Sequence, residues 1–98
     1  MNRTVLIFDL LHPGPENGIK LSELAAPTNQ DEREVRRRIQ TERKDGKLIL
    51  SDCLHGYFLP ECPEDVQRFA RSMSRRAAEI AGIARAAEAA LADMAGQE

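Results

Sequence analysis

The sequence has few of the residues that build a large core or a disulfide framework. Its 98 residues include three phenylalanines, one tyrosine and no tryptophan, so the core must be mostly aliphatic and small. Two cysteines, Cys53 and Cys62, fall far below the density of a secreted disulfide scaffold, and we expect reduced thiols. No apolar run approaches the roughly 20 residues of a membrane-spanning helix, and the N-terminus lacks a signal-peptide pattern. We therefore expect a cytoplasmic protein with no membrane partner.

Patterns typical of catalysis and of metal binding are also missing. No nucleophile with its base, no glycine-rich phosphate loop and no paired catalytic carboxylates can be identified. His12, His55 and the two cysteines are four potential zinc ligands, but no closely spaced pair is present to nucleate a site. We expect no enzymatic activity, no metal and no cofactor.

Length and composition predict one small domain with one additional element. Hydrophobic residues make up 42% and charged residues 31%, which is ordinary for a folded protein. The formal net charge is −2, so attraction to nucleic acid would have to come from local segregation of charge.

The N-terminal third predicts two short helices around a loop. Residues 5–11 are almost all apolar and fit either a short buried helix or a strand; we prefer a helix capped by Thr4. Residues 12–18, rich in proline and glycine, predict a loop. Ser22 is a natural N-cap for a very short helix over residues 23–26, which Pro27 closes or kinks.

The middle of the chain predicts a third helix followed by a hairpin. Asp31 with Glu34 three residues later is a capping-box pattern, and helical spacing continues for roughly 14 residues to Gly46. Residues 47–51 and 57–59 are strand-like and flank a turn. Beyond them, Pro63 and two acids open one long helix that nothing stops before Gly96.

This order, with a tight turn between the second and third helices, is the layout of a winged helix-turn-helix. Within this layout, one set of residues follows a known family pattern: Leu24, Ala25, Val35, Arg36, Arg37, Ile39, Gly46, Ile49 and residues 56–60. Through these residues, the segment 19–61 resembles the winged-helix domain of the biotin operon repressor type, and the whole chain resembles small uncharacterised winged-helix proteins of prophages. The resemblance implies a winged domain over residues 1–61 and a long oligomerisation helix over residues 62–98.

Four positions of the turn and third helix differ from that family's pattern. Pro27 and Gln30 stand where apolar residues are usual around the turn, and Glu42 stands where leucine is usual. Asn29 takes the usual glycine position, which asparagine tolerates because it readily adopts a left-handed backbone. The first three differences predict a distorted turn, whereas the fourth is compatible with it.

The third helix is expected to carry a DNA-binding face. With Val35 and Ile39 facing inward at about 100° per residue, basic and polar residues fall on the opposite side, while Asp31, Glu32 and Glu42 fall toward the buried side or its margins. Arginine pairs bidentately with guanine and neutralises phosphate, although a merely solvated face is the alternative. The expected DNA-binding residues are Arg33, Arg36, Arg37, Gln40, Thr41 and Lys44.

The tip of the hairpin is a weak candidate for DNA contact. Residues 52–56 contain no lysine or arginine, and His55 is most simply an exposed turn residue without a function.

The long helix predicts self-association. Its apolar and small residues recur in heptads over four repeats, more than one small domain can cover. The alternatives are a helix that folds back over its own domain and an alanine-rich tail that frays in solution. The expected dimerisation residues are Met73, Ile80, Ile83, Ala84, Ala87 and Leu91.

Four arginines lie near the start of this helix and form either solvated ion pairs or a second phosphate-binding cluster: Arg68, Arg71, Arg75 and Arg76.

The sequence thus predicts a small bacterial or prophage DNA-binding protein for transcription or phage replication control. It is expected to be a homodimer that presents two third helices to duplex DNA. The rival hypothesis is a winged-helix protein-interaction or assembly module without direct DNA binding.

Overall fold

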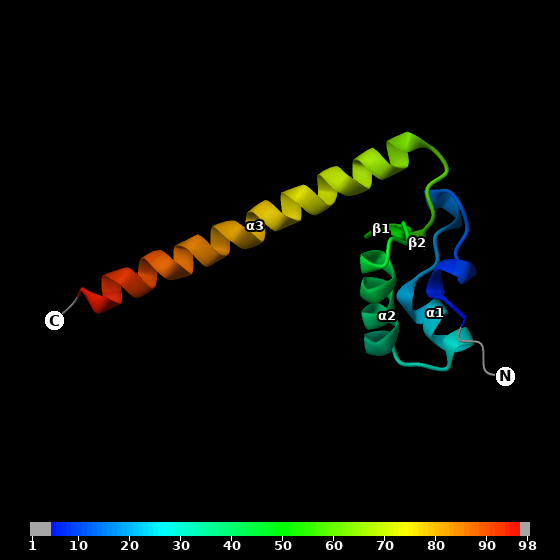
Figure 1. Ribbon diagram of the computed structural model, residues 1–98, viewed down its shortest axis with the longest axis horizontal. Helices are drawn as coiled ribbons and strands as arrows, with labels where there is room; N and C mark the ends of the chain where they lie inside the picture. The colour runs from blue at the N-terminus through cyan, green and yellow to red at the C-terminus, as the bar shows by residue number, and fades with distance from the viewer. Residues whose placement is uncertain (1–4, 97–98) are drawn as a thin grey trace.

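The computed structural model describes residues 5–96 and is mainly helical, with one short antiparallel hairpin (Figure 1). Two short 3-10 helices, η1 (Ile7–Leu10) and η2 (Pro15–Asn17), precede helix α1 (Leu21–Thr28) and helix α2 (Glu32–Lys44). Strands β1 (Leu50–Asp52) and β2 (Gly56–Phe58) follow, and helix α3 (Pro63–Ala95) ends the chain. The predicted mainly helical fold with a small β-hairpin and a long C-terminal helix is confirmed.

The segment predicted as a short helix is helical over residues 7–10 only. Residues 7–10 form a single 3-10 helix rather than an α-helix, and the expected cap Thr4 lies outside the described residues. The turn is held from elsewhere in the chain, because both carboxylate oxygens of Glu42 accept its first backbone N–H groups. Glu42 is therefore buried as a hydrogen-bond acceptor for the N-terminal segment, a role that leucine at this position could not fill.

Helix α1 is longer than predicted at both ends. It begins at Leu21, where the carboxylate of Glu23 accepts the backbone N–H of Lys20 at 2.9 Å, so Ser22 is not its N-cap. Pro27 lies inside the helix and does not end it. The hydroxyl of Thr28 donates to the carbonyls of the last turn, which helps to close the helix one residue beyond the proline.

A left-handed residue connects α1 to α2, as predicted. Asn29 has φ 54° and ψ 37°, and it follows the last helical residue directly. The Asp31 side chain then accepts the backbone N–H of Glu34 at 2.9 Å, which confirms the predicted N-cap of α2. α1 and α2 pack against each other across this connection.

The core lies between η1, α1, α2 and the segment entering β1. It is aliphatic, as the shortage of aromatic residues predicts, and it consists of Ile7, Leu11, Leu24, Val35, Ile39 and Ile49. In the hairpin, Leu50 pairs with Phe58, and Ile19 forms an additional antiparallel bridge with Tyr57 on the other edge of β2. The hairpin is shorter than the predicted strands but lies in the expected place.

Helix α3 packs against β1 through its first turns and then leaves the rest of the molecule (Figure 1). The molecule measures 63 × 34 × 23 Å, and the free part of α3 accounts for its long axis. The alternative of a helix folded back over its own domain is therefore not what the structure shows. Among residues 5–96, no helix has the length and apolarity to cross a membrane.

Candidate nucleic-acid interface

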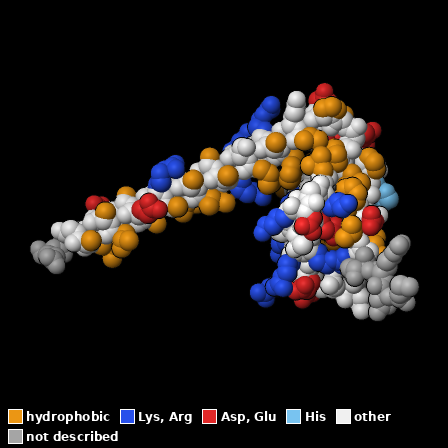
Figure 2. All heavy atoms as spheres, in the orientation of Figure 1, with side chains coloured by type: hydrophobic (Ala, Val, Ile, Leu, Met, Phe, Trp, Pro, Cys, Tyr) orange, Lys and Arg blue, Asp and Glu red, His pale blue; other side chains and the backbone are white. Residues whose placement is uncertain are grey.

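The exposed side of α2 gathers the six residues predicted to bind DNA. All of them are exposed, whereas Val35, Ile39 and Glu42 on the opposite side are buried. Figure 2 shows lysine and arginine side chains along the edge of α2 that borders the open angle under α3. We call this surface the α2 basic face; it consists of Arg33, Arg36, Arg37, Gln40, Thr41 and Lys44.

The arginines of α2 divide into an exposed set and a fixed set. Arg38 donates to the side chain of Gln30 at 2.9 Å and to the backbone carbonyl of Val5, so its guanidinium ties α2 to the N-terminal segment. Gln30 thus has a polar role at a position where an apolar residue was usual. Arg33 and Arg36, by contrast, form no ion pair within residues 5–96.

Arg43 is the second fixed arginine. Its guanidinium donates to the Ile49 carbonyl at 2.9 Å and to the Ser51 hydroxyl at 3.1 Å, and it lies over the rings of Tyr57 and Phe69. Burial lowers its pKa below the ordinary value for arginine; Tyr57 opposes this shift, and the nearby charge of Arg76 adds to it. Arg43 therefore joins α2, the hairpin and α3, and the sequence alone gave no sign of this role.

Acidic residues modify the α2 basic face at one end. Glu34 lies 3.5 Å from Arg37, and both side chains are largely exposed, so solvent screens their attraction. Asp31 and Glu32, predicted to fall toward the buried side or its margins, are exposed at the N-terminus of α2, whereas Glu42 is buried. Near the helix N-terminus they stabilise the helix dipole. The three arginines of the face thus lie among acids in its N-terminal half, whereas Lys44 is the cation at its C-terminal end, next to the exposed Asp45.

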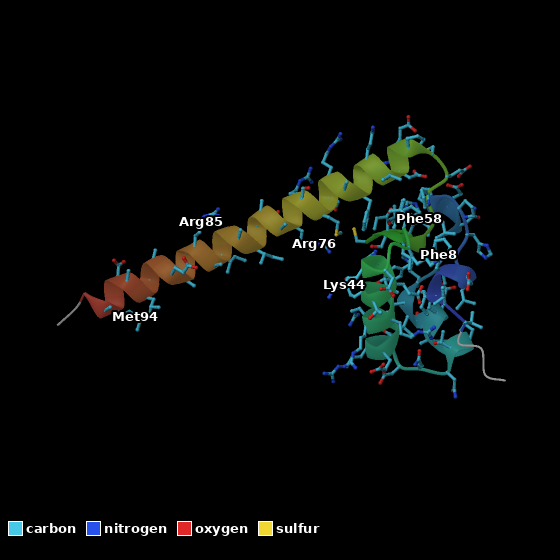
Figure 3. The ribbon with its side chains drawn as sticks, in the orientation of Figure 1. Phe8, Lys44, Phe58, Arg76, Arg85 and Met94 are labelled. Atoms are coloured by element: carbon cyan, nitrogen blue, oxygen red, sulfur yellow. The ribbon has the colours of Figure 1, made fainter. Side chains whose placement is uncertain are left out.

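Lys44 at that end faces the same open angle as Arg76 of α3 (Figure 3). Arg76 lines a shallow pocket with the hairpin residues Ser51, Asp52 and Tyr57. Of the four arginines in the second basic cluster, Arg68 is held at 2.9 Å by the buried carboxylate of Asp65. The structure therefore separates the cluster, and Arg76 is the member that lies near α2.

The hairpin tip is held by its own side chains. Asp52 accepts from the Leu54 backbone at 3.0 Å, and one of its oxygens lies 2.9 Å from Nδ1 of His55. Partial desolvation raises the pKa of Asp52, but the hydrogen bonds and charge of His55 outweigh it and lower the pKa overall. The carboxylate offsets any positive charge on His55, so the tip presents no net basic surface.

The four potential zinc ligands of the sequence are not gathered into one site within residues 5–96. Cys53 and Cys62 are both exposed free cysteines. Across residues 5–96, no group of three or more histidine, cysteine, aspartate or glutamate side chains is arranged to hold a metal ion.

The predicted dimerisation residues lie along the free part of α3, with one exception. Met73 is half-buried against the rest of the chain, whereas Ile80, Ile83 and Leu91 are 61%, 71% and 67% exposed. Met94, which is 71% exposed, extends the same row. We call this surface the α3 stripe; its members are Ile80, Ile83, Ala84, Ala87, Ala90, Leu91 and Met94.

No family model, no curated protein and no solved structure matches the chain.

Proposed function

We propose that the protein binds duplex DNA as a winged helix-turn-helix, with α2 in the major groove and the hairpin as the wing. The observation that carries the proposal is the division of the arginines on α2. Arg38 and Arg43 are fixed within the fold, while the α2 basic face stays exposed opposite the buried Val35 and Ile39. A helix in the major groove requires such a side, because base edges and phosphates must be reached without breaking the core.

The surrounding elements support the same function. α1 and α2 meet through the left-handed Asn29, the hairpin follows α2 directly, and Ile19 extends the hairpin as a third strand segment. On the α2 basic face, Arg33 and Arg37 would contact the groove, and Arg36, Gln40 and Lys44 would position the DNA backbone. The tip of the wing contributes little, because its carboxylate and imidazole are paired. The cellular role we propose is transcription or phage replication control in a bacterium or prophage.

Fluorescence anisotropy with a labelled duplex of random sequence tests this proposal. We expect binding at low salt that weakens as salt rises, because cations that neutralise phosphates release counterions from DNA. Selection of bound sequences from a random pool would then identify the preferred site. Absence of binding even at the lowest salt would contradict the proposal.

The α3 stripe supports self-association as part of this function. Four large apolar side chains on one face of a helix, all more than 60% exposed, leave apolar surface in water that a second copy would bury. We propose a homodimer formed by α3. Its alanines let two helices approach closely but bury little area, so we expect dissociation on dilution.

The second candidate function is an assembly module whose winged domain and stripe bind proteins rather than DNA. The net charge of −2 and the absence of a basic hairpin tip favour it. It predicts a partner complex that persists when the α2 basic face is neutralised.

A further inference from the structure

We infer that the partner covering the α3 stripe is a second copy of α3 running antiparallel, with its twofold axis at Ala87. This inference rests on the self-association proposed above and not on DNA binding. It specifies the orientation, the register and the contacts of the pair.

The first argument is that the α3 stripe continues toward the N-terminus of α3 as a longer apolar row, and the chain itself covers that end of the row. At about 100° per residue, Val66, Phe69 and Met73 lie on the same side of α3 as Ile80 and Leu91. This early part faces the rest of the chain, where the guanidinium carbon of Arg43 lies 5.0 Å from the centre of the Phe69 ring. The same row is exposed from Ile80 onward.

Such a half-covered helix excludes a parallel pair in register. In that arrangement, residues 63–76 of each copy would have to run beneath residues 63–76 of the other. That space is occupied by β1 and by Arg43 of the same chain. In an antiparallel pair, the second copy's helix ends at its Ala95, close to the point where the first copy's α3 begins to pack against its own β1. The free part, residues 77–95, spans about 28 Å, enough for two such segments to lie side by side.

The second argument is the symmetry of the row itself. Its large residues are spaced evenly about Ala87, seven residues away in Ile80 and Met94 and four away in Ile83 and Leu91. An antiparallel pair centred at Ala87 therefore places Ile80 against Met94 and the two Ala87 residues against each other. In the layer between them, helical projection puts Ile83 beside Ala90 and Leu91 beside Ala84, so each large side chain meets a small one.

The third argument is the position of the single charge on this side. Among residues 66–95, Arg76 is the only charged residue that projects into the row. In a parallel pair, two Arg76 side chains would face each other within the seam. In the antiparallel pair, each lies beside the C-terminal end of the other helix, where the helix dipole favours a cation.

Cysteine cross-linking tests the register on the full chain. Cys53 and Cys62 are replaced by serine, and Ile80→Cys, Met94→Cys and Ala87→Cys are introduced one at a time. Under mild oxidation we expect Ala87→Cys to form a homodisulfide, and we expect a mixed disulfide when the Ile80→Cys and Met94→Cys proteins are combined. Neither the Ile80→Cys nor the Met94→Cys protein should form a homodisulfide. In this register the two copies of either position lie about 21 Å apart along the helix, whereas a disulfide needs about 6 Å between Cα atoms.

Sedimentation equilibrium supplies the second measurement. We expect a concentration-dependent dimer that Ile83→Glu with Leu91→Glu abolishes, while Ala89→Glu on the opposite side of α3 leaves it intact. Homodisulfides of Ile80→Cys or Met94→Cys that equal or exceed the mixed disulfide would overturn the antiparallel register. A monomer at every concentration would overturn the pair itself. DNA titration of the same proteins is a separate readout, so failure of DNA binding and failure of pairing are distinguishable.

Discussion

The carboxylate of Glu42 accepts the backbone N–H of Ile7 at 2.7 Å, across 35 residues of chain. Its second oxygen accepts the backbone N–H of Phe8 at 2.8 Å, and the residue is only 5% exposed. These two N–H groups are the first of the 3-10 helix, and the first N–H groups of a helix have no acceptor within the helix itself. An acid at an otherwise apolar position of α2 therefore fixes the N-terminal segment on the core.

Replacing Glu42 with leucine should destabilise the fold despite the better match to the family pattern. One buried and one partly buried N–H group would lose their acceptors, and we expect the free energy of unfolding to fall by about 2–4 kcal/mol. Glu42→Gln keeps one acceptor oxygen and should lose less. Urea unfolding followed by circular dichroism measures both, with the exposed Glu88→Gln as control. A leucine variant as stable as the original protein would contradict this role.

Asn29 offers a test of the connection between α1 and α2. Its φ of 54° is costly for most residues and unstrained for glycine. We expect Asn29→Gly to change stability by less than about 1 kcal/mol, and Asn29→Val to cost about 1–2 kcal/mol. Thermal unfolding would show the difference as a lower midpoint for the valine variant only. Equal midpoints for glycine and valine would argue against a required left-handed residue.

The elements predicted correctly from the sequence are those specified by local signals. Asp31 caps α2 through its own side chain, Pro63 and the acids after it begin α3, and Asn29 supplies the left-handed residue. Each of these signals acts within a few residues of the chain. Pro27 misled the prediction of α1, because the helix continues through the proline to Thr28, whose hydroxyl bonds to the carbonyls of Leu24 and Ala25 in the last turn.

The N-terminal segment and the fixed arginines could not be derived in the same way. Residues 5–11 are apolar enough for a helix or a strand, and a distant carboxylate decides their conformation. Helical projection identified the exposed side of α2 correctly, but it could not assign Arg38 and Arg43 to structural roles. Their acceptors, the carbonyls of Val5 and Ile49, are brought near only by the tertiary fold.

Arg43 should be a structural residue and not a DNA contact. Arg43→Lys keeps the charge but cannot reach both Ile49 and Ser51 with one planar group, and it stacks less well on Phe69. We expect a loss of about 1–2 kcal/mol in the free energy of unfolding, with DNA affinity unchanged once the protein is folded. Arg36→Lys, on the exposed side, is the matched control and should leave stability unchanged. A DNA affinity that falls without a change in stability would assign Arg43 to the interface instead.

The start of α3 should be sensitive to acid. The backbone N–H of Glu61 donates to the Asp65 carboxylate at 3.0 Å and, with the charge of Arg68, holds its pKa below the ordinary 3.8 although burial opposes this. Because the folded pKa is lowered, the ionised carboxylate stabilises the fold above pH about 4 and loses that effect as pH falls through the folded pKa. Asp65→Asn should therefore be less stable at neutral pH, with a gap that narrows in acid. Asp93→Asn is the control; a gap independent of pH would exclude this linkage.

The α2 basic face should determine the salt dependence of DNA binding. Each cation that neutralises a phosphate contributes about 0.9 to the slope of log affinity against log salt, so Arg33→Ala with Arg37→Ala should reduce the slope by up to about 1.8. Arg85→Ala removes one positive charge from the far side of α3 and should leave the slope unchanged, where loss of one phosphate contact would lower it by about 0.9 (Figure 3). Anisotropy titrations across a salt series measure all three proteins. If each removed charge lowers the slope equally in the double variant and in Arg85→Ala, DNA binding depends on overall charge and not on α2. If DNA never binds while the double variant retains a protein partner, the assembly function is favoured.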